Sequence, residues 1–296
     1  MHRHAITRRS VLAATALACA APVRAQTPQR VAAIDWAMLE TALALGVTPV
    51  AATELVQFRR QVIEPEAPAG ITDLGLRGMP SFELLRMTAP DLILISNFYE
   101  NLRPVYERIA PVFSATIFAQ GEPPYPLAER ATTALGERLG LAGQAEAVID
   151  DARRRIGAIR DSLATVERRP VFVVSLGDAR HLRAFGSDSL FGNVLDRLGF
   201  DNAWEGASSY SAAAPVGMEA LARVPDARLV VVEPTPPEVS RVLATSALWR
   251  ALPMVRAGRV AFMEPVNHFG ALPSACRFAR LFAAVLLRGD GSVSDG

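Results

Sequence analysis

In both halves of the sequence, polar and aromatic residues follow apolar segments that predict strands. In chain order, these candidate ligand-binding residues are Trp36, Arg77, Tyr99, His181, Trp204, Tyr210, Ser211, Asn267, His268 and Phe269. Because open parallel sheets bind ligands at the carboxyl ends of their strands, we expect the two groups to face one cleft. A guanidinium among aromatic side chains suits a bulky, partly apolar ligand that displays oxygen acceptors.

These residues do not form a recognisable catalytic or metal site. His181 and His268 lack the spacing of a metal-binding pair, and no cluster of carboxylates and histidines is visible. The sequence has no dinucleotide fingerprint, nucleophile elbow or zincin motif. It also has no lysine, which excludes P-loop, Schiff-base and pyridoxal-phosphate sites. We therefore predict no catalytic residue, no cofactor and no metal held by protein side chains.

Several candidates also have a simpler interpretation. Trp36 and Phe269 could belong to the hydrophobic core, and Arg77 alone could be a solvated surface arginine.

The stretch around Arg77 has the repeating unit of a parallel sheet. A glycine-containing loop with Arg77 precedes a helix that begins near Glu83, a Pro-Asp turn and the apolar run 92–95. The second half repeats this order, with Glu219, a Pro-Asp turn and the apolar run 229–232. The repeat predicts two similar α/β lobes.

Between the two halves, apolar residues recur at spacings of three and four from Gln144 to Val166, which predicts a helix roughly 35 Å long. The predicted fold class is α/β, with two Rossmann-like lobes that contain parallel sheets, are joined by one long α-helix and enclose a ligand cleft. The expected domains are a signal peptide over 1–25, an N-terminal lobe over 26–142, the connecting helix over 143–168 and a C-terminal lobe over 169–296.

The N-terminus predicts export. Arg8-Arg9 precedes a short alanine-rich apolar run, and 23–25 supplies a small-residue cleavage site, as in Tat-type signals. The residues before Cys19 form a poor lipobox, so we do not expect a lipid anchor. Cys276 lies in an apolar helical pattern and is expected to be a buried, inert thiol. The formal net charge of +1 argues against nucleic acid as the partner.

The chain resembles the periplasmic iron(III)-hydroxamate siderophore-binding proteins, which share a fold group with the vitamin B12-binding proteins of ABC importers. The resemblance covers nearly all of the chain after residue 30. It is carried by the segments 33–36, 43–47, 64–65, 73–77, 109–111, 178–181, 185–191, 202–204 and 248–259.

The resemblance implies roles for individual residues. It assigns the family's ligand-binding arginine to Arg77, its siderophore-contacting tyrosine to Tyr99 and a pocket tryptophan to Trp36. Glu83 and Glu219 correspond to the paired carboxylates, one per lobe, that dock onto arginines of the permease.

The second lobe departs from the family pattern. Ser211, beside Tyr210, replaces a family tryptophan, and Asn267 and His268 replace an aromatic pair next to Phe269. The predicted pocket is therefore more polar than the family pattern.

From this resemblance we predict a monomeric periplasmic protein that is not an enzyme. It is expected to bind a ferric siderophore, with all iron ligands supplied by the siderophore, and to deliver it to an inner-membrane ABC permease. The alternatives are a binding protein for cobalamin, haem or ferric citrate, or an exported chelatase-like or hydrolytic enzyme. A clustered carboxylate and histidine in the cleft would favour the enzyme.

Overall fold

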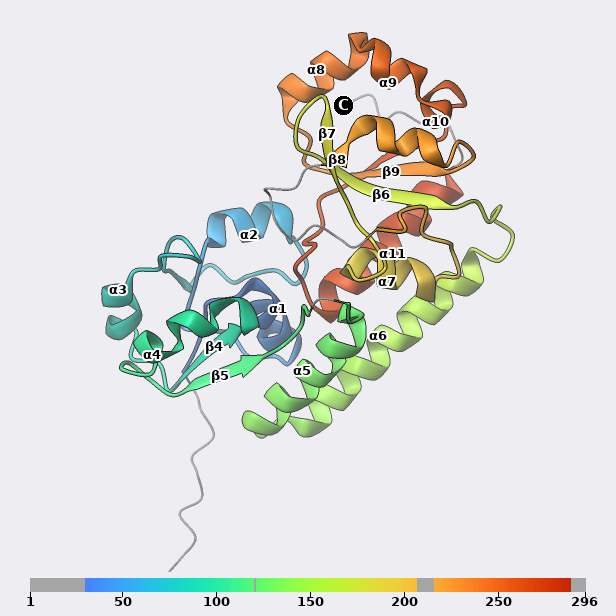
Figure 1. Ribbon diagram of the computed structural model, residues 1–296. Helices are drawn as coiled ribbons and strands as arrows, with labels where there is room; N and C mark the ends of the chain where they lie inside the picture. Colours follow the sequence, from blue (N-terminus) through green and yellow to red (C-terminus); the bar gives the residue numbers. More distant parts are fainter. Residues whose placement is uncertain (1–29, 120, 207–215, 289–296) are drawn as a thin grey trace, which may run out of the picture.

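Two α/β lobes make up the computed structural model, which describes residues 30–119, 121–206 and 216–288 (Figure 1). The elements of the first lobe are β1 (Val31–Ala33), α1 (Trp36–Ala44), β2 (Ala51–Ala52), α2 (Leu55–Gln61), β3 (Thr72–Asp73), α3 (Phe82–Met87), β4 (Leu92–Ser96), η1 (Asn97–Leu102), α4 (Arg103–Tyr106), β5 (Val112–Ala115) and α5 (Pro124–Arg138). Helix α6 (Ala142–Ser162) follows. The elements of the second lobe are β6 (Val171–Leu176), β7 (His181–Ala184), α7 (Leu190–Arg197), β8 (Val216–Gly217), η2 (Met218–Arg223), β9 (Arg228–Val232), α8 (Pro237–Thr245), α9 (Ala247–Ala251), α10 (Pro253–Arg256), β10 (Val260–Met263) and α11 (Leu272–Leu287).

Each lobe contains one five-stranded sheet. The first has the order β3-β2-β1-β4-β5, and all its pairs are parallel. The second has the order β10-β9-β6-β7-β8, in which β10, β9 and β6 are parallel while β7 and β8 pair antiparallel. The predicted α/β class is confirmed. The sequence predicted parallel sheets in both lobes, and the antiparallel strands β7 and β8 at the edge of the second sheet were not predicted.

The two lobes share a backbone feature at the end of one helix each. Gly46 after α1 and Gly199 after α7 have φ angles of +80° and +79°. In both places the next residue donates a backbone hydrogen bond into the last helical turn, from Val47 to Ala42 and from Phe200 to Leu195. Glycine adopts this left-handed conformation at little steric cost, so both helices end in the same way.

The joint between the lobes is broader than one helix. Helix α6 packs against α5 and α11, and α11 also packs against α1 and α7 (Figure 1). One hydrophobic cluster therefore contains Leu39 of the first lobe, Ile149 of α6, Leu195 of the second lobe and Phe282 of α11. No helix in the described ranges is both long and apolar enough to cross a membrane.

Candidate functional site

A cavity of about 620 Å³ lies where residues of the two lobes meet. Residues from the ends of β6 and β9, from β7 and from the loop before α11 form its second-lobe wall. Of the candidates predicted from sequence, those that line it are Trp36, Arg77, His181, Asn267, His268 and Phe269. The structure therefore brings candidates from both halves of the chain into one cavity.

Trp36 and Arg77 form a stacked pair on the first-lobe side. The hydrogen-bonded cap at Asp35, whose carboxylate accepts from the backbone amide of Ala37 at 2.8 Å, begins helix α1 at Trp36. Trp36 is buried, and its Nε1 donates to the carbonyl oxygen of Thr53 at 3.1 Å. The guanidinium carbon of Arg77 lies 3.9 Å from the centroid of the Trp36 ring, within the range of a cation–π contact. Trp36 is thus both a core residue and part of the cavity wall.

Glu54 fixes the orientation of Arg77. Its carboxylate accepts from Nε of Arg77 at 2.8 Å and from the Arg77 backbone amide at 3.0 Å. Both side chains are only partly exposed, at 27% and 18%. Within the described ranges, the two terminal amino groups of Arg77 make no hydrogen bond, so they are available to acceptors on a ligand.

Tyr99 is close enough to this pair for their charges to affect it, but it is not among the residues that line the cavity. It is half-buried and packs against the apolar cluster of the first lobe. Burial, together with the negative charge of Asp35 and against the opposing effect of Arg77, raises the pKa of Tyr99 to about 12. The phenol therefore remains protonated and can act as a hydrogen-bond donor.

Asn267 holds the loop that carries His268 and Phe269. Its Nδ2 donates to the buried Glu40 carboxylate of α1 at 2.8 Å, and its Oδ1 accepts from the Phe269 backbone amide at 3.1 Å. The amide of Asn267 thus has partners on both sides, and its contribution is to position the cavity wall. The same Glu40 carboxylate accepts from the backbone amides of Ala271 and Ser274 and from the Ser274 hydroxyl. Burial raises the pKa of Glu40 to about 7, although these hydrogen bonds oppose the shift.

His268 is neutral and accepts a hydrogen bond from an arginine that sequence reasoning missed. Nη1 of Arg183 on β7 donates to Nε2 of His268 at 2.7 Å. Burial, together with the positive charges of Arg183 and Arg77, lowers the pKa of His268 to about 3. In the sequence, Arg183 alternates with Leu182 and Ala184, which are buried, and such alternation indicates a half-buried strand. The strand has only four residues, His181–Ala184, so this signal is weak.

Of the remaining second-lobe candidates that the structure describes, His181 lines the cavity and Trp204 does not. Trp204 is half-buried and packs against the second-lobe core, outside the cavity lining. Tyr210 and Ser211 fall outside the described residues. His181 pairs through Nδ1 with Asp178 at 2.9 Å. Over the ranges that the structure describes, histidine, cysteine, aspartate and glutamate form no group of three that could hold a metal ion.

The two predicted docking carboxylates are exposed and lie outside the cavity. Glu83 is in the first turn of α3, which is capped by the Ser81 hydroxyl. Glu219 is in the first turn of η2 and lines a separate hollow of about 550 Å³ with Val242 and Leu248.

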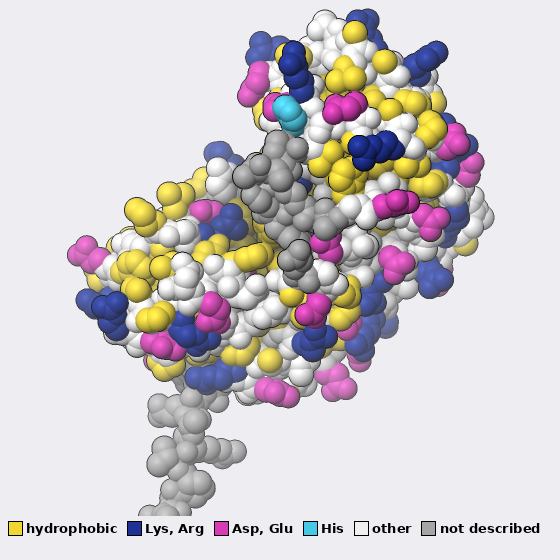
Figure 2. Space-filling model, viewed as in Figure 1, with side chains coloured by type: hydrophobic (Ala, Val, Ile, Leu, Met, Phe, Trp, Pro, Cys, Tyr) yellow, Lys and Arg dark blue, Asp and Glu magenta, His cyan; other side chains and the backbone are white. Residues whose placement is uncertain are grey.

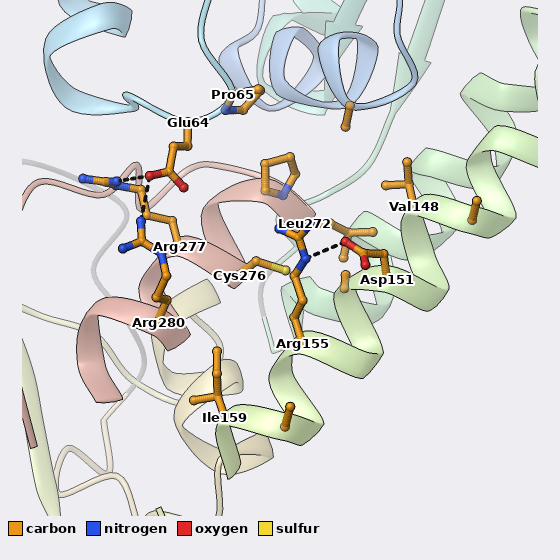
Figure 3. Close-up of a pocket in the computed structure, with 15 residues that line it drawn as sticks. Glu64, Pro65, Val148, Asp151, Arg155, Ile159, Leu272, Cys276, Arg277 and Arg280 are labelled. Carbon is orange, nitrogen blue, oxygen red and sulfur yellow. Dashed lines mark hydrogen bonds and ion pairs between the residues drawn. The ribbon is translucent and has the colours of Figure 1, made fainter. Parts of the chain in front are cut away.

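A further cavity of about 680 Å³ lies among α6, α11 and the loop at Glu64 (Figure 3). Its charged side chains are already paired: Glu64 with Arg277 and Arg280, and Asp151 with Arg155. Burial raises the pKa of the Cys276 thiol to about 11, so the thiol remains protonated. The cavity between the lobes has the more suitable chemistry for a polar ligand.

Comparisons with known proteins agree with this geometry. Residues 31–266 match a family model described as periplasmic binding protein. The chain is 31% identical over 282 residues, 93% of this chain and 95% of the relative, to the iron(3+)-hydroxamate-binding protein FhuD of Escherichia coli (strain K12). It is 28% identical over 227 residues, covering 70% of this chain and 69% of the relative, to the achromobactin-binding periplasmic protein of Dickeya dadantii (strain 3937).

A solved structure of a siderophore-binding protein also matches this chain. The crystal structure of the siderophore-binding protein FhuD from Vibrio cholerae, bound to Fe³⁺-Desferal, matches with a TM-score of 0.82 and 27% identity over 87% of this chain and 97% of that chain. These findings confirm the resemblance that the sequence motifs predicted. The chain therefore belongs to the periplasmic binding protein family of which FhuD is a member.

Proposed function

We propose that this chain is the substrate-binding protein of an ABC importer, which captures a ferric siderophore of the hydroxamate type in the periplasm. The observation that carries the proposal is the arrangement of Arg77. Its guanidinium is fixed between Trp36 and Glu54 beside an interlobe cavity of about 620 Å³, with its terminal amino groups free of hydrogen bonds in the described ranges. Such a donor suits the negatively polarised oxygens around a ferric ion.

In the proposed complex, the siderophore supplies all the iron ligands and the protein binds the chelate as a unit. Arg77 donates hydrogen bonds to iron-bound oxygens, and Trp36 and Phe269 pack on the organic shell. Tyr99, whose phenol remains protonated, acts as the second donor. Trp204, Tyr210 and Ser211 remain proposed contacts from the second lobe, and Asn267 contributes by holding the loop.

A binding role fits this site better than the enzymatic alternative. The histidine deepest in the cavity wall, His268, has a pKa near 3 and already accepts a hydrogen bond from Arg183. It is therefore poorly suited to act as a general base near neutral pH. The named relatives are likewise binding proteins.

We further propose that Glu83 and Glu219 dock the loaded protein onto its permease in one orientation. Both carboxylates are exposed, and both have exposed apolar side chains nearby in sequence or space: Met79 and Met87 for Glu83, and Val242 and Leu248 for Glu219. Figure 2 shows exposed hydrophobic side chains over the first lobe. A charge surrounded by apolar area is a common arrangement at protein interfaces, where it provides orientation as well as burial.

The function can be tested by titrating tryptophan fluorescence with a panel of metal chelates. Ferric desferrioxamine B and a ferric trihydroxamate of different backbone should give saturable quenching, because Trp36 lies at the cavity wall. Cobalamin, haem and ferric citrate should bind more weakly. The Trp36→Phe variant lacks the fluorescent reporter at the cavity. Its binding is therefore measured by calorimetry, which shows whether a lost fluorescence signal reflects lost binding. Saturation by cobalamin or haem without binding of either ferric hydroxamate would contradict the proposal.

A further inference from the structure

Arg183 is a second arginine in the cavity wall, and its surroundings differ from those of Arg77. Arg77 has the Glu54 carboxylate at 2.8 Å. Arg183 is half-buried on β7, and its hydrogen bond is to His268, a neutral ring. Among the residues that the structure describes, no carboxylate lies within ion-pair distance of Arg183.

The carboxylates that line the same cavity are satisfied by their own turns. Asp178 accepts from backbone amides two and three residues ahead and pairs with the His181 ring. Glu233 accepts from the backbone amide and the hydroxyl of Thr235. Neither supplies the counter-charge that a partly buried guanidinium requires.

The position of Arg183 is fixed before any ligand arrives. Its partner His268 lies in the loop that Asn267 ties to the buried Glu40 of the first lobe at 2.8 Å. The His268 ring also contacts Phe185 and Phe269, with ring centroids 5.5 Å and 4.3 Å away. One N–H of Arg183 is used by His268, which leaves the other N–H groups of the fork for an acceptor in the cavity.

We propose that Arg183 pairs with a carboxylate of the ligand, so that this protein selects ferric hydroxamate complexes that also carry an anionic carboxylate over neutral or cationic ones. This inference rests on the proposed function. The ligand carboxylate supplies the counter-charge that the described part of the chain does not, and a guanidinium can hold it in a bidentate geometry. The carboxylate can be pendant on the organic shell, or it can be part of an α-hydroxycarboxylate that replaces one hydroxamate at the iron.

The first arm of the test uses chelates that share one iron-binding group and differ in the charge of a pendant group. Ferric desferrioxamine B has a pendant ammonium, its N-acetyl derivative is neutral at that position, and its N-succinyl derivative carries a carboxylate. A ferric complex of two hydroxamates and one α-hydroxycarboxylate forms the second arm. Affinities are measured by calorimetry for the parent, for Arg183→Gln and for Arg180→Gln, an exposed arginine outside this cavity.

We expect the parent to bind at least one carboxylate-bearing complex about tenfold more tightly than the N-acetyl complex, the scale of one charge-assisted hydrogen bond. Arg183→Gln should lose this preference while keeping its affinity for the N-acetyl complex and its unfolding midpoint. Arg180→Gln should behave as the parent. Comparison of the two arms shows whether the carboxylate is pendant or bound to iron.

Three results would overturn the inference. If the parent binds all the complexes equally, or if Arg183→Gln keeps the preference, Arg183 does not select a carboxylate, although the proposed function stands. If no ferric complex binds to the parent, the proposed function fails and this inference fails with it.

Discussion

The guanidinium carbon of Arg77 lies 3.9 Å from the centroid of the Trp36 ring, and the Glu54 carboxylate accepts from Nε of the same guanidinium at 2.8 Å. The donor is thus placed before a ligand arrives, so less conformational entropy is lost on binding. If the Arg77 side chain is removed, Glu54 loses its guanidinium partner and keeps only the hydrogen bond from the backbone amide at position 77. The effect of an Arg77 substitution therefore has two components.

The first prediction separates those components. Arg77→Ala should lower affinity for a ferric hydroxamate about tenfold to a hundredfold, because it deletes charge-assisted hydrogen bonds and leaves a carboxylate beside the ligand oxygens. The double variant Glu54→Gln/Arg77→Ala should recover part of this loss. Calorimetric titration measures both, with Arg86→Ala on α3 as an exposed control. Parental affinity in Arg77→Ala would show that Arg77 does not contact the ligand.

The second prediction concerns the pH dependence of stability. Burial raises the pKa of Glu40 to about 7 from its usual 4.5, so the folded state binds this proton more tightly than the unfolded state does. The contribution of Glu40 to the free energy of unfolding is fully present below about pH 4.5 and is lost as pH rises through about 7. This is a change of roughly 3 kcal/mol. Urea unfolding of the parent and of Glu40→Gln at about pH 5 and pH 7.5 isolates this contribution.

Glu40→Gln should show a smaller loss of stability between the two pH values than the parent does. Its absolute stability should be lower at both, because an amide cannot accept from Asn267 and from the Ala271 and Ser274 amides together. Glu83→Gln, which changes an exposed carboxylate, should keep the parental pH dependence. An identical pH dependence in Glu40→Gln and the parent would show that Glu40 titrates normally.

The third prediction concerns docking. Glu83 and Glu219 are exposed and lie outside the cavity, so replacing both with glutamine should leave the fold and siderophore affinity nearly unchanged. Uptake through the reconstituted permease should fall severely, because each lobe loses an orienting charge. Transport is compared at equal ligand occupancy, with Glu107→Gln/Glu137→Gln as an exposed double control. If the Glu83/Glu219 variant transports as well as the parent, the two carboxylates do not dock the protein and only stabilise the ends of their helices.

The fourth prediction concerns motion. Helices α6 and α11 share one hydrophobic cluster with both lobes, so a large hinge movement would have to break core packing. We therefore expect ligand binding to close the lobes by a few degrees rather than tens of degrees. Small-angle scattering with and without a ferric siderophore should give nearly the same radius of gyration. A large decrease on binding would contradict the shared-core account.

Local sequence signals predicted the features that depend on neighbouring residues. Gly46 and Gly199 end their helices in the left-handed conformation, and a helix end of this kind is decided within one turn of the local sequence. The connecting helix was predictable because its apolar period persists over many residues. Trp36 and Arg77 line the cavity because both lie at the carboxyl edge of a parallel sheet, where the topology brings them together, and this position can be read from the order of strands in the sequence.

The remaining parts of the site depend on contacts between distant residues. Asn267 is tied to Glu40 across 227 positions, so its role in holding a loop had no local signature. Strand β7 pairs antiparallel and covers only His181–Ala184, too short for a clear alternation, and Arg183 was missed with it. Arg183 and His268 are 85 positions apart, and their bond became visible only in the folded chain.

The measurement that tests the central claim most directly is a calorimetric titration of the parent protein with ferric desferrioxamine B and, as the matched control, with the metal-free chelator. Capture of the intact ferric complex predicts one binding site, with the ferric form bound at least about tenfold more tightly, because iron organises the oxygens that Arg77 is positioned to meet. The absorption spectrum of the ferric hydroxamate should stay unchanged on binding, since the protein supplies no iron ligand. Equal affinity for the two forms, or no binding of the ferric form, would contradict the claim.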